Sequence, residues 1–105
     1  MPTKDTPLRI HELLELIRKR PGFYIVERSI YPLDSFLGGY VLGVRWSGII
    51  LQDYDDLARF GDWLAPRLGF SASVSGAANM IREKSSSDSD AFDRFFTLWD
   101  EFKRA

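Results

Sequence analysis

Apolar residues recur at helical spacing along most of the chain. The first stripe consists of Ile10, Leu13, Leu14 and Ile17. These positions lie three or four residues apart, which predicts an amphipathic helix over residues 7–19. Thr6 and Pro7 are the expected N-cap and first-turn proline, and Pro21-Gly22 ends the helix. The basic residues 18–20 then fall in its last turn, where cations complement the helix dipole.

The clearest pattern predicts a second helix over residues 31–47. Its apolar face consists of Leu33, Phe36, Leu37, Tyr40, Val41 and Val44. Glycines at positions 38, 39 and 43 interrupt this helix, and each costs about 1 kcal/mol relative to alanine in a helix interior. We therefore expect another helix, or a partner, to approach this backbone closely, with simple tolerance of the glycines as the alternative. Gly48 is the expected stop.

Three further helices are predicted over residues 54–68, 73–84 and 89–104. The first of them has an apolar face made of Leu57, Phe60, Leu64 and Leu68. Pro66 lies inside this pattern and is expected to kink the helix or to end it near Ala65, and Gly69 closes the segment. The last helix carries an aromatic stripe at the spacing of a buried face, made of Phe92, Phe95, Phe96, Trp99 and Phe102.

Two segments between these helices are predicted to be connections. Residues 23–29 are too short and isolated to indicate a sheet, and the serine- and aspartate-rich residues 85–90 indicate a solvated loop before a capped helix. With 105 residues, the chain has room for one core and not for two. The pattern as a whole predicts a single all-α domain of four to five helices over residues 1–105.

Composition excludes several classes of function. Hydrophobic residues make up 45% of the chain, so it can bury a core, and the absence of cysteine excludes disulfides and thiolate chemistry. A formal net charge of −1 gives no general attraction to nucleic acid or to anionic membranes. The N-terminus does not have the pattern of a signal peptide, and no apolar run reaches the roughly 20 residues of a membrane span. A cytoplasmic protein is therefore expected.

Candidate catalytic chemistry is sparse. His11 is the single histidine, whereas a zinc site needs three or four ligands and a serine triad needs a histidine beside a nucleophile. We therefore predict no catalytic residue, no cofactor and no metal site. The acidic residues that cluster near the third helix are Asp53, Asp55, Asp56 and Asp62. Carboxylates at such a position stabilise a helix start. Two alternative interpretations remain open: an acidic recognition surface and a catalytic carboxylate pair.

A binding surface is the main alternative for these residues. From residue 51 onward the chain carries ten acidic and seven basic side chains, a balance that suits a basic partner such as a nuclease. Aromatic residues outside the stripes can anchor an interface: Tyr24, Tyr31, Trp46, Tyr54 and Trp63. The candidate partner-binding residues are Asp53, Asp55, Asp56, Asp62, Tyr24, Arg28 and Trp46.

The segment Arg18–Ile25 is similar to the Arg-Pro-Gly-Met-Tyr-Ile-Gly segment in the ATPase domain of type II topoisomerases. In that family a helix of the form Glu-x-x-x-Asn follows and serves nucleotide and magnesium. The helix from Leu33 to Trp46 contains neither glutamate nor asparagine, and the chain is too short for that domain. We therefore reject an ATPase assignment.

Four segments form a longer pattern, namely Arg20–Ile25, Ser29–Tyr40, Phe60–Leu64 and Ala91–Phe102. This pattern, which includes Arg-Pro-Gly-x-Tyr-Ile, resembles a family of small bacterial immunity-type proteins associated with polymorphic and contact-dependent toxins. The chain departs from it at Val26, where the family tends to have glycine, and over residues 71–89. The resemblance implies a non-catalytic protein that binds and neutralises a cognate toxin, and it carries over no catalytic residue.

Three hypotheses remain open from the sequence. The first is this immunity-type binding module, as a monomer or a homodimer with no nucleic acid or membrane partner. The second is a small ligand-binding domain or enzyme that combines the carboxylates with Arg20, Arg28 or Arg45. The third is a homo-oligomeric structural module, which the glycine-bearing helix favours.

Overall fold

The computed structural model describes residues 7–71 and 75–105. Its helices are α1 (Ile10–Lys19), α2 (Ile30–Trp46), α3 (Asp56–Arg67), α4 (Gly76–Glu83) and α5 (Asp88–Arg104), with a 3₁₀ turn, η1 (Pro21–Phe23), after α1. This described part contains no strand, so the predicted all-α fold of four to five helices is confirmed. None of the helices described is both long and apolar enough to cross a bilayer.

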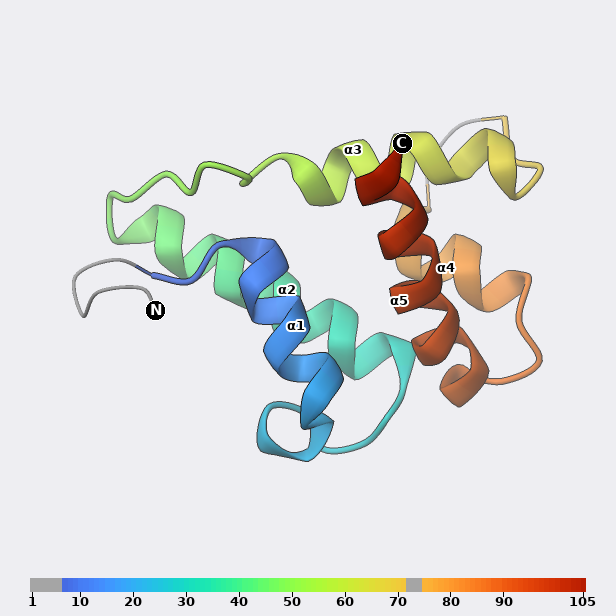
Figure 1. The fold of residues 1–105 in the computed structure, drawn as a ribbon, viewed down its shortest axis with the longest axis horizontal. Helices are drawn as coiled ribbons and strands as arrows, with labels where there is room; N and C mark the ends of the chain where they lie inside the picture. The colour runs from blue at the N-terminus through green and yellow to red at the C-terminus, as the bar shows by residue number, and fades with distance from the viewer. Residues whose placement is uncertain (1–6, 72–74) are drawn as a thin grey trace.

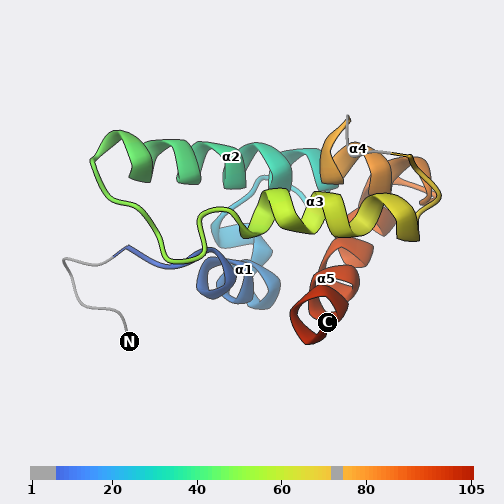
Figure 2. The same cartoon turned by 90° about the horizontal axis from the view of Figure 1, so that it is seen from above.

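The helix α2 runs along the molecule with other helices on one side of it (Figure 1). α1, α3 and α5 lie on that side, and α3 runs roughly antiparallel to α2 (Figure 2). α4 packs closely against α5, α3 and the N-terminal end of α2. In Figure 2 no described helix lies on the far side of the C-terminal half of α2, so this half has one side that no described helix covers.

An aromatic cluster within the core surrounds Phe60 of α3, which is fully buried. Its ring meets Phe95 and Trp99 of α5 edge-on, with centroid distances of 5.2 and 5.1 Å, and lies 5.5 Å from the ring of Phe102. The predicted aromatic stripe of α5 is therefore confirmed as the buried face, with Phe102 partly exposed at its end. These ring contacts join α3 to α5.

The first helix begins later than the sequence predicts. α1 starts at Ile10, so Pro7 precedes the helix and is not in its first turn; Thr6 lies outside the described residues. The physical reason is a cap that comes from elsewhere in the chain. The carboxylate of Asp53 accepts hydrogen bonds from the backbone N–H groups of Ile10 and His11, at 3.0 and 3.2 Å, across a sequence separation of 43 and 42 residues. These bonds satisfy donors that a helix start leaves unpaired.

Gly48 ends α2, as predicted. Its φ of 88° is a left-handed conformation that glycine adopts without strain. The N–H of Gly48 donates to the carbonyl of Arg45 at 3.0 Å, and the N–H of Ile49 donates to that of Val44 at 3.3 Å, which is the Schellman pattern. This turn directs the chain away from the helix axis, and residues 49 and 50 follow directly after it.

α3 ends in the same way at Gly69, whose φ is 85°. The N–H of Phe70 donates to the carbonyl of Ala65 at 2.8 Å, and the helix extends to Arg67. Pro66 therefore lies in the last turn, and the expectation of an end near Ala65 is wrong by two residues. The predicted start of the fourth helix at residue 73 lies outside the described residues.

The last helix has the predicted cap. Ser87 Oγ accepts from the N–H of Asp90 at 3.0 Å, and the Asp90 carboxylate accepts from the N–H of Ser86 at 2.9 Å. This backbone hydrogen bond lowers the pKa of Asp90 below its ordinary value, and the neighbouring Arg94 acts in the same direction.

The lowered pKa of Asp90 makes its contribution to stability depend on pH. Because the carboxylate is favoured in the folded state, its stabilisation is present above the unfolded pKa and is lost as the pH falls through the folded pKa. Asp90→Asn is therefore expected to lower the free energy of unfolding at pH 7, and to have less effect at acidic pH. Urea denaturation of both proteins across this range measures the difference, and a difference that stays constant with pH would contradict this assignment.

Candidate functional site

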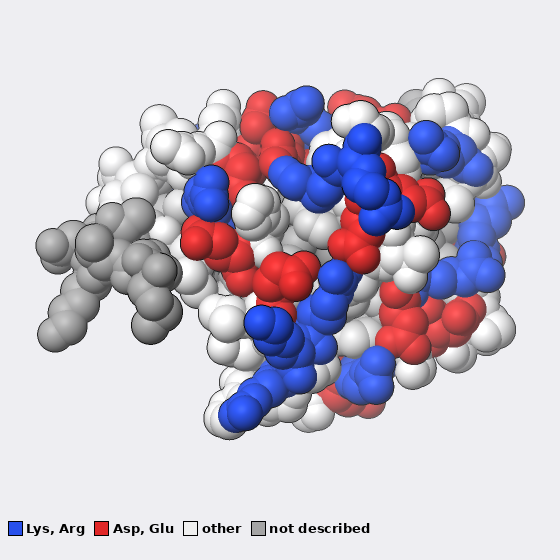
Figure 3. Space-filling model, in the orientation of Figure 1, with Lys and Arg blue, Asp and Glu red and all other residues white. Residues whose placement is uncertain are grey.

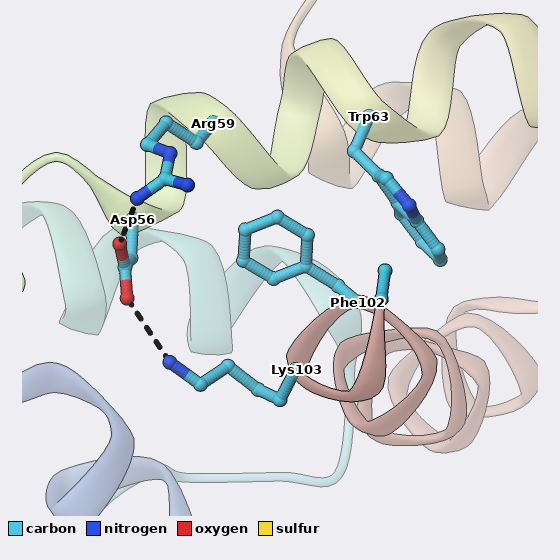
Figure 4. Close-up of a pocket in the computed structure, with 6 residues that line it drawn as sticks. Asp56, Arg59, Trp63, Phe102 and Lys103 are labelled. Atoms are coloured by element: carbon cyan, nitrogen blue, oxygen red, sulfur yellow. Dashed lines mark hydrogen bonds and ion pairs between the residues drawn. The ribbon is translucent and has the colours of Figure 1, made fainter.

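Two of the four predicted acidic residues hold the fold together. Asp53 caps α1. Asp56 is buried, with 7% of its surface exposed. Its carboxylate accepts from Arg59 at 3.3 Å and from Lys103 at 3.1 Å, so it ties the start of α3 to the end of α5 (Figure 4).

This ion-pair cluster lines a cavity of about 300 Å³ together with Trp63, Phe102 and Ala105. Figure 4 shows Arg59 and Lys103 pointing toward the two oxygens of Asp56. Both cations that could hold an anionic ligand are thus already paired with a carboxylate. The lining offers no hydroxyl, thiol or imidazole as a nucleophile. We assign the cluster a structural role.

His11 lines a neighbouring hollow of about 270 Å³ with Glu15, Trp99, Asp100 and Lys103. Both carboxylates there are held by Arg18, at 3.3 Å from Glu15 and 2.9 Å from Asp100. Across residues 7–71 and 75–105, no group of three or more histidine, aspartate and glutamate side chains is placed to hold a metal ion.

The remaining predicted residues are dispersed. Asp62 is exposed on α3, and Asp55 is exposed at the N-cap position directly before it. Tyr24 is half-buried, with its ring edge-on to Phe36 at 6.2 Å. Arg28 pairs with Asp93 of α5 at 2.7 Å. Two of the four acidic residues are thus engaged inside the fold, and Figure 3 shows acidic and basic side chains intermingled over α1 and α5.

The arginines of the enzyme hypothesis are similarly separated. Arg20 lies over the ring of Phe23 at 5.5 Å, whereas Arg28 reaches α5 and Arg45 lies near the end of α2. These three arginines lie in different parts of the fold. They form no convergent set with the carboxylates of α3.

Trp46 differs from the other predicted residues because 81% of its surface is exposed. Ile50 is 75% exposed and Ile49 is 39% exposed, directly after the turn at Gly48. We call Trp46, Ile49 and Ile50 the apolar tip. In Figure 3 the corresponding upper-left region, over the end of α2 and the segment that follows, is mostly uncharged.

A groove runs beside the tip, between α2 and α3. One part of about 410 Å³ is lined by Gly38, Val41, Leu42, Arg45, Tyr54, Leu57 and Ala58. A second part of about 280 Å³ shares three of these residues and extends the lining to Asp34, Leu37, Ala77 and Phe95. We call the two parts together the α2–α3 groove. Its floor is apolar, with one carboxylate and one guanidinium at its ends.

The glycines of α2 face open space. A Cβ atom built at Gly38, Gly39 or Gly43 would meet no described atom within 4 Å beyond its own local backbone. The expectation that another helix of this chain packs closely against them is therefore wrong. Their helical backbone has no positive φ, so glycine is not required for conformation. Approach by a partner is the part of the expectation that stays open.

Gly39→Ala tests this interpretation of the helix. Alanine adds no clash and loses less backbone entropy, so the free energy of unfolding should rise by about 0.5–1 kcal/mol. Chemical denaturation of the two proteins measures the change. A fall in stability would mean that the space around Gly39 is occupied.

Comparison with known protein families, with curated proteins and with solved structures gave no match. The site is therefore defined by its geometry. The sequence singles out Trp46 but does not single out Leu42, Ile49 and Ile50, which are also exposed. One sequence signal could have indicated this surface: α2 carries apolar residues outside the stripe that faces the core. A helix with apolar residues on several sides is normally covered on several sides, so an apolar side without a covering helix indicates a binding surface.

Proposed function

We propose that this chain is a non-catalytic protein-binding module that neutralises a cognate bacterial toxin by direct binding. The observation that carries the proposal is the apolar tip. Tryptophan and isoleucine side chains exposed together are unfavourable in water and are typical of interface anchors. The chemistry of the tip suits contact with another protein and not turnover of a small molecule.

The class of partner rests on the resemblance to immunity-type proteins. Its four segments supply much of the core, including Phe60, Leu64, Phe92 and Trp99. The apolar tip lies outside all four segments. This division supports the proposal. Residues shared across a family would maintain the common fold, and residues outside the shared pattern can differ so that each protein binds its own partner.

The exposed charge at the start of α3 adds a weaker preference. Asp55 is exposed there, next to the half-exposed ring of Tyr54. An exposed acidic side chain favours a basic partner, such as a nuclease, and increases the rate of encounter. Asp53 and Asp56 form hydrogen bonds inside the fold, so they contribute less to an acidic binding surface than the sequence predicts.

Co-expression with the product of the adjacent gene tests the proposal. We expect a complex that co-elutes on size exclusion and restores growth when the partner is toxic. The double variant W46D/I50D should weaken the complex at least about a hundredfold, since each anchor removed from an interface centre costs about 2 kcal/mol or more.

The matched control is Val26→Asp, which places the same charge at an apolar residue that is 100% exposed in the connection before α2. This variant should bind as the wild type does. Absence of a complex, absence of growth rescue, or equal binding by W46D/I50D would contradict the proposal. Circular dichroism of each variant confirms that the fold is kept.

A further inference from the structure

The two ends of the α2–α3 groove carry opposite charges. Asp34 lies at one end and Arg45 at the other, both on α2. They are about three helical turns, or about 16 Å, apart, so they lie along the same edge of the helix. Neither side chain forms a hydrogen bond or an ion pair with any described residue. The groove walls displace water around Asp34 and raise its pKa, with no cation nearby to oppose the effect.

The positions between these charges are small or apolar. Gly38, Val41 and Leu42 line the groove from α2, and Leu57 and Ala58 line it from α3. Because nothing covers Gly38, the backbone of another helix can approach α2 closely at this point. The groove thus has an apolar centre and a charged rim, as protein interfaces do.

This arrangement is complementary to itself. The midpoint between Asp34 and Arg45 falls between Gly39 and Tyr40, and the midpoint between Gly38 and Val41 falls there too. A second α2 laid antiparallel about this point brings Asp34 opposite Arg45 of the second copy, twice. It also places each Gly38 opposite a Val41. A twofold interface requires such a match of one surface with itself.

We propose that the α2–α3 groove is the interface of a homodimer, in which two α2 helices pack antiparallel and Asp34 of each copy pairs with Arg45 of the other. This inference goes beyond the proposed function. It concerns the groove, whereas toxin binding is assigned to the apolar tip, and it is tested on the purified chain alone. Either proposal can therefore fail without the other.

Charge reversal tests the pairing. Sedimentation equilibrium of the wild type should show a monomer–dimer equilibrium. D34R places two arginines opposite each other at each end of the interface, and R45D places two aspartates there. Each single variant should raise the dimer dissociation constant at least about tenfold, since opposed like charges replace two ion pairs.

Two recombinations separate pairing from general damage. The double variant D34R/R45D restores both pairs in reversed order and should dimerise as the wild type does. An equimolar mixture of D34R and R45D should form a heterodimer, because arginine then meets aspartate at both ends. Glu27→Arg, an equal charge change outside the groove, should leave dimerisation unchanged.

Several results would overturn the inference. A wild type that stays monomeric up to about 1 mM excludes a dimer of useful affinity. A dimer that neither single variant weakens, or a mixture that does not associate, excludes this pairing. If the chain is monomeric and D34R weakens the toxin complex instead, the groove belongs to the toxin and the homodimer is wrong.

Discussion

Phe60→Ala is expected to lower the free energy of unfolding by about 3–5 kcal/mol, the usual cost of removing a buried phenylalanine ring. Phe60 is fully buried and contacts three rings of α5, at centroid distances of 5.1 to 5.5 Å. The change would remove the contact that joins α3 to α5 and leave a cavity. Because small domains have about 5–15 kcal/mol of stability in total, this single change would remove a large fraction of it.

Phe23→Ala is the matched control for this change. The ring of Phe23 is 72% exposed, and its main neighbour is the guanidinium of Arg20. Its removal should change the free energy of unfolding by no more than about 0.5 kcal/mol. Urea denaturation at 25 °C measures both variants. If the two variants lost similar free energies of unfolding, the ring contacts between α3 and α5 would not have the stabilising role assigned to them.

Asp53→Ala is expected to lower the free energy of unfolding by about 1–2 kcal/mol. The substitution removes the acceptor for two backbone N–H groups at the start of α1 and frees the loop between α2 and α3 from that helix. Amide hydrogen exchange should rise first at Ile10 and His11. Thermal and chemical denaturation give the total effect.

Asp55→Ala separates this role from the general effect of an acidic residue. Asp55 lies only two residues after Asp53 in the sequence. It is exposed and makes no side-chain capping bond. The stability of this variant should change much less than that of Asp53→Ala. If the two variants lost the same amount, local charge and not the long-range cap would explain the result.

The helices themselves could be predicted because their causes are local. The periodicity of apolar residues in α2 and α5 and the terminal glycines at positions 48 and 69 act within a few residues. The start of α1 could not be predicted in this way. Its cap comes from Asp53, and nothing near Ile10 in the sequence indicates that a distant loop supplies the acceptor.

The candidate site was harder to predict, because a sequence shows charges without their partners. Asp53 and Asp56 are part of an acidic cluster in the sequence, yet each makes contacts inside the fold. Trp46, which its residue type singles out, is exposed in the structure. The α2–α3 groove could not be predicted, since it depends on how far α3 stands from α2.

The tip and the groove divide the uncovered part of α2 between them. Gly38 and Leu42 line the groove, and Trp46, the last residue of α2, belongs to the apolar tip. A homodimer through the groove would display two tips. Each chain would then keep its own surface for the toxin.

The most direct test of the account follows Trp46 during binding. The other two tryptophans lie inside, with Trp99 buried and Trp63 half-buried, so acrylamide quenches Trp46 most readily. The difference in quenching between the wild type and the Trp46→Phe variant gives the contribution of Trp46. On saturation with the product of the adjacent gene, we predict that this signal becomes protected from acrylamide. A complex that forms while Trp46 stays fully quenchable would contradict the assignment of the apolar tip as the toxin-binding surface.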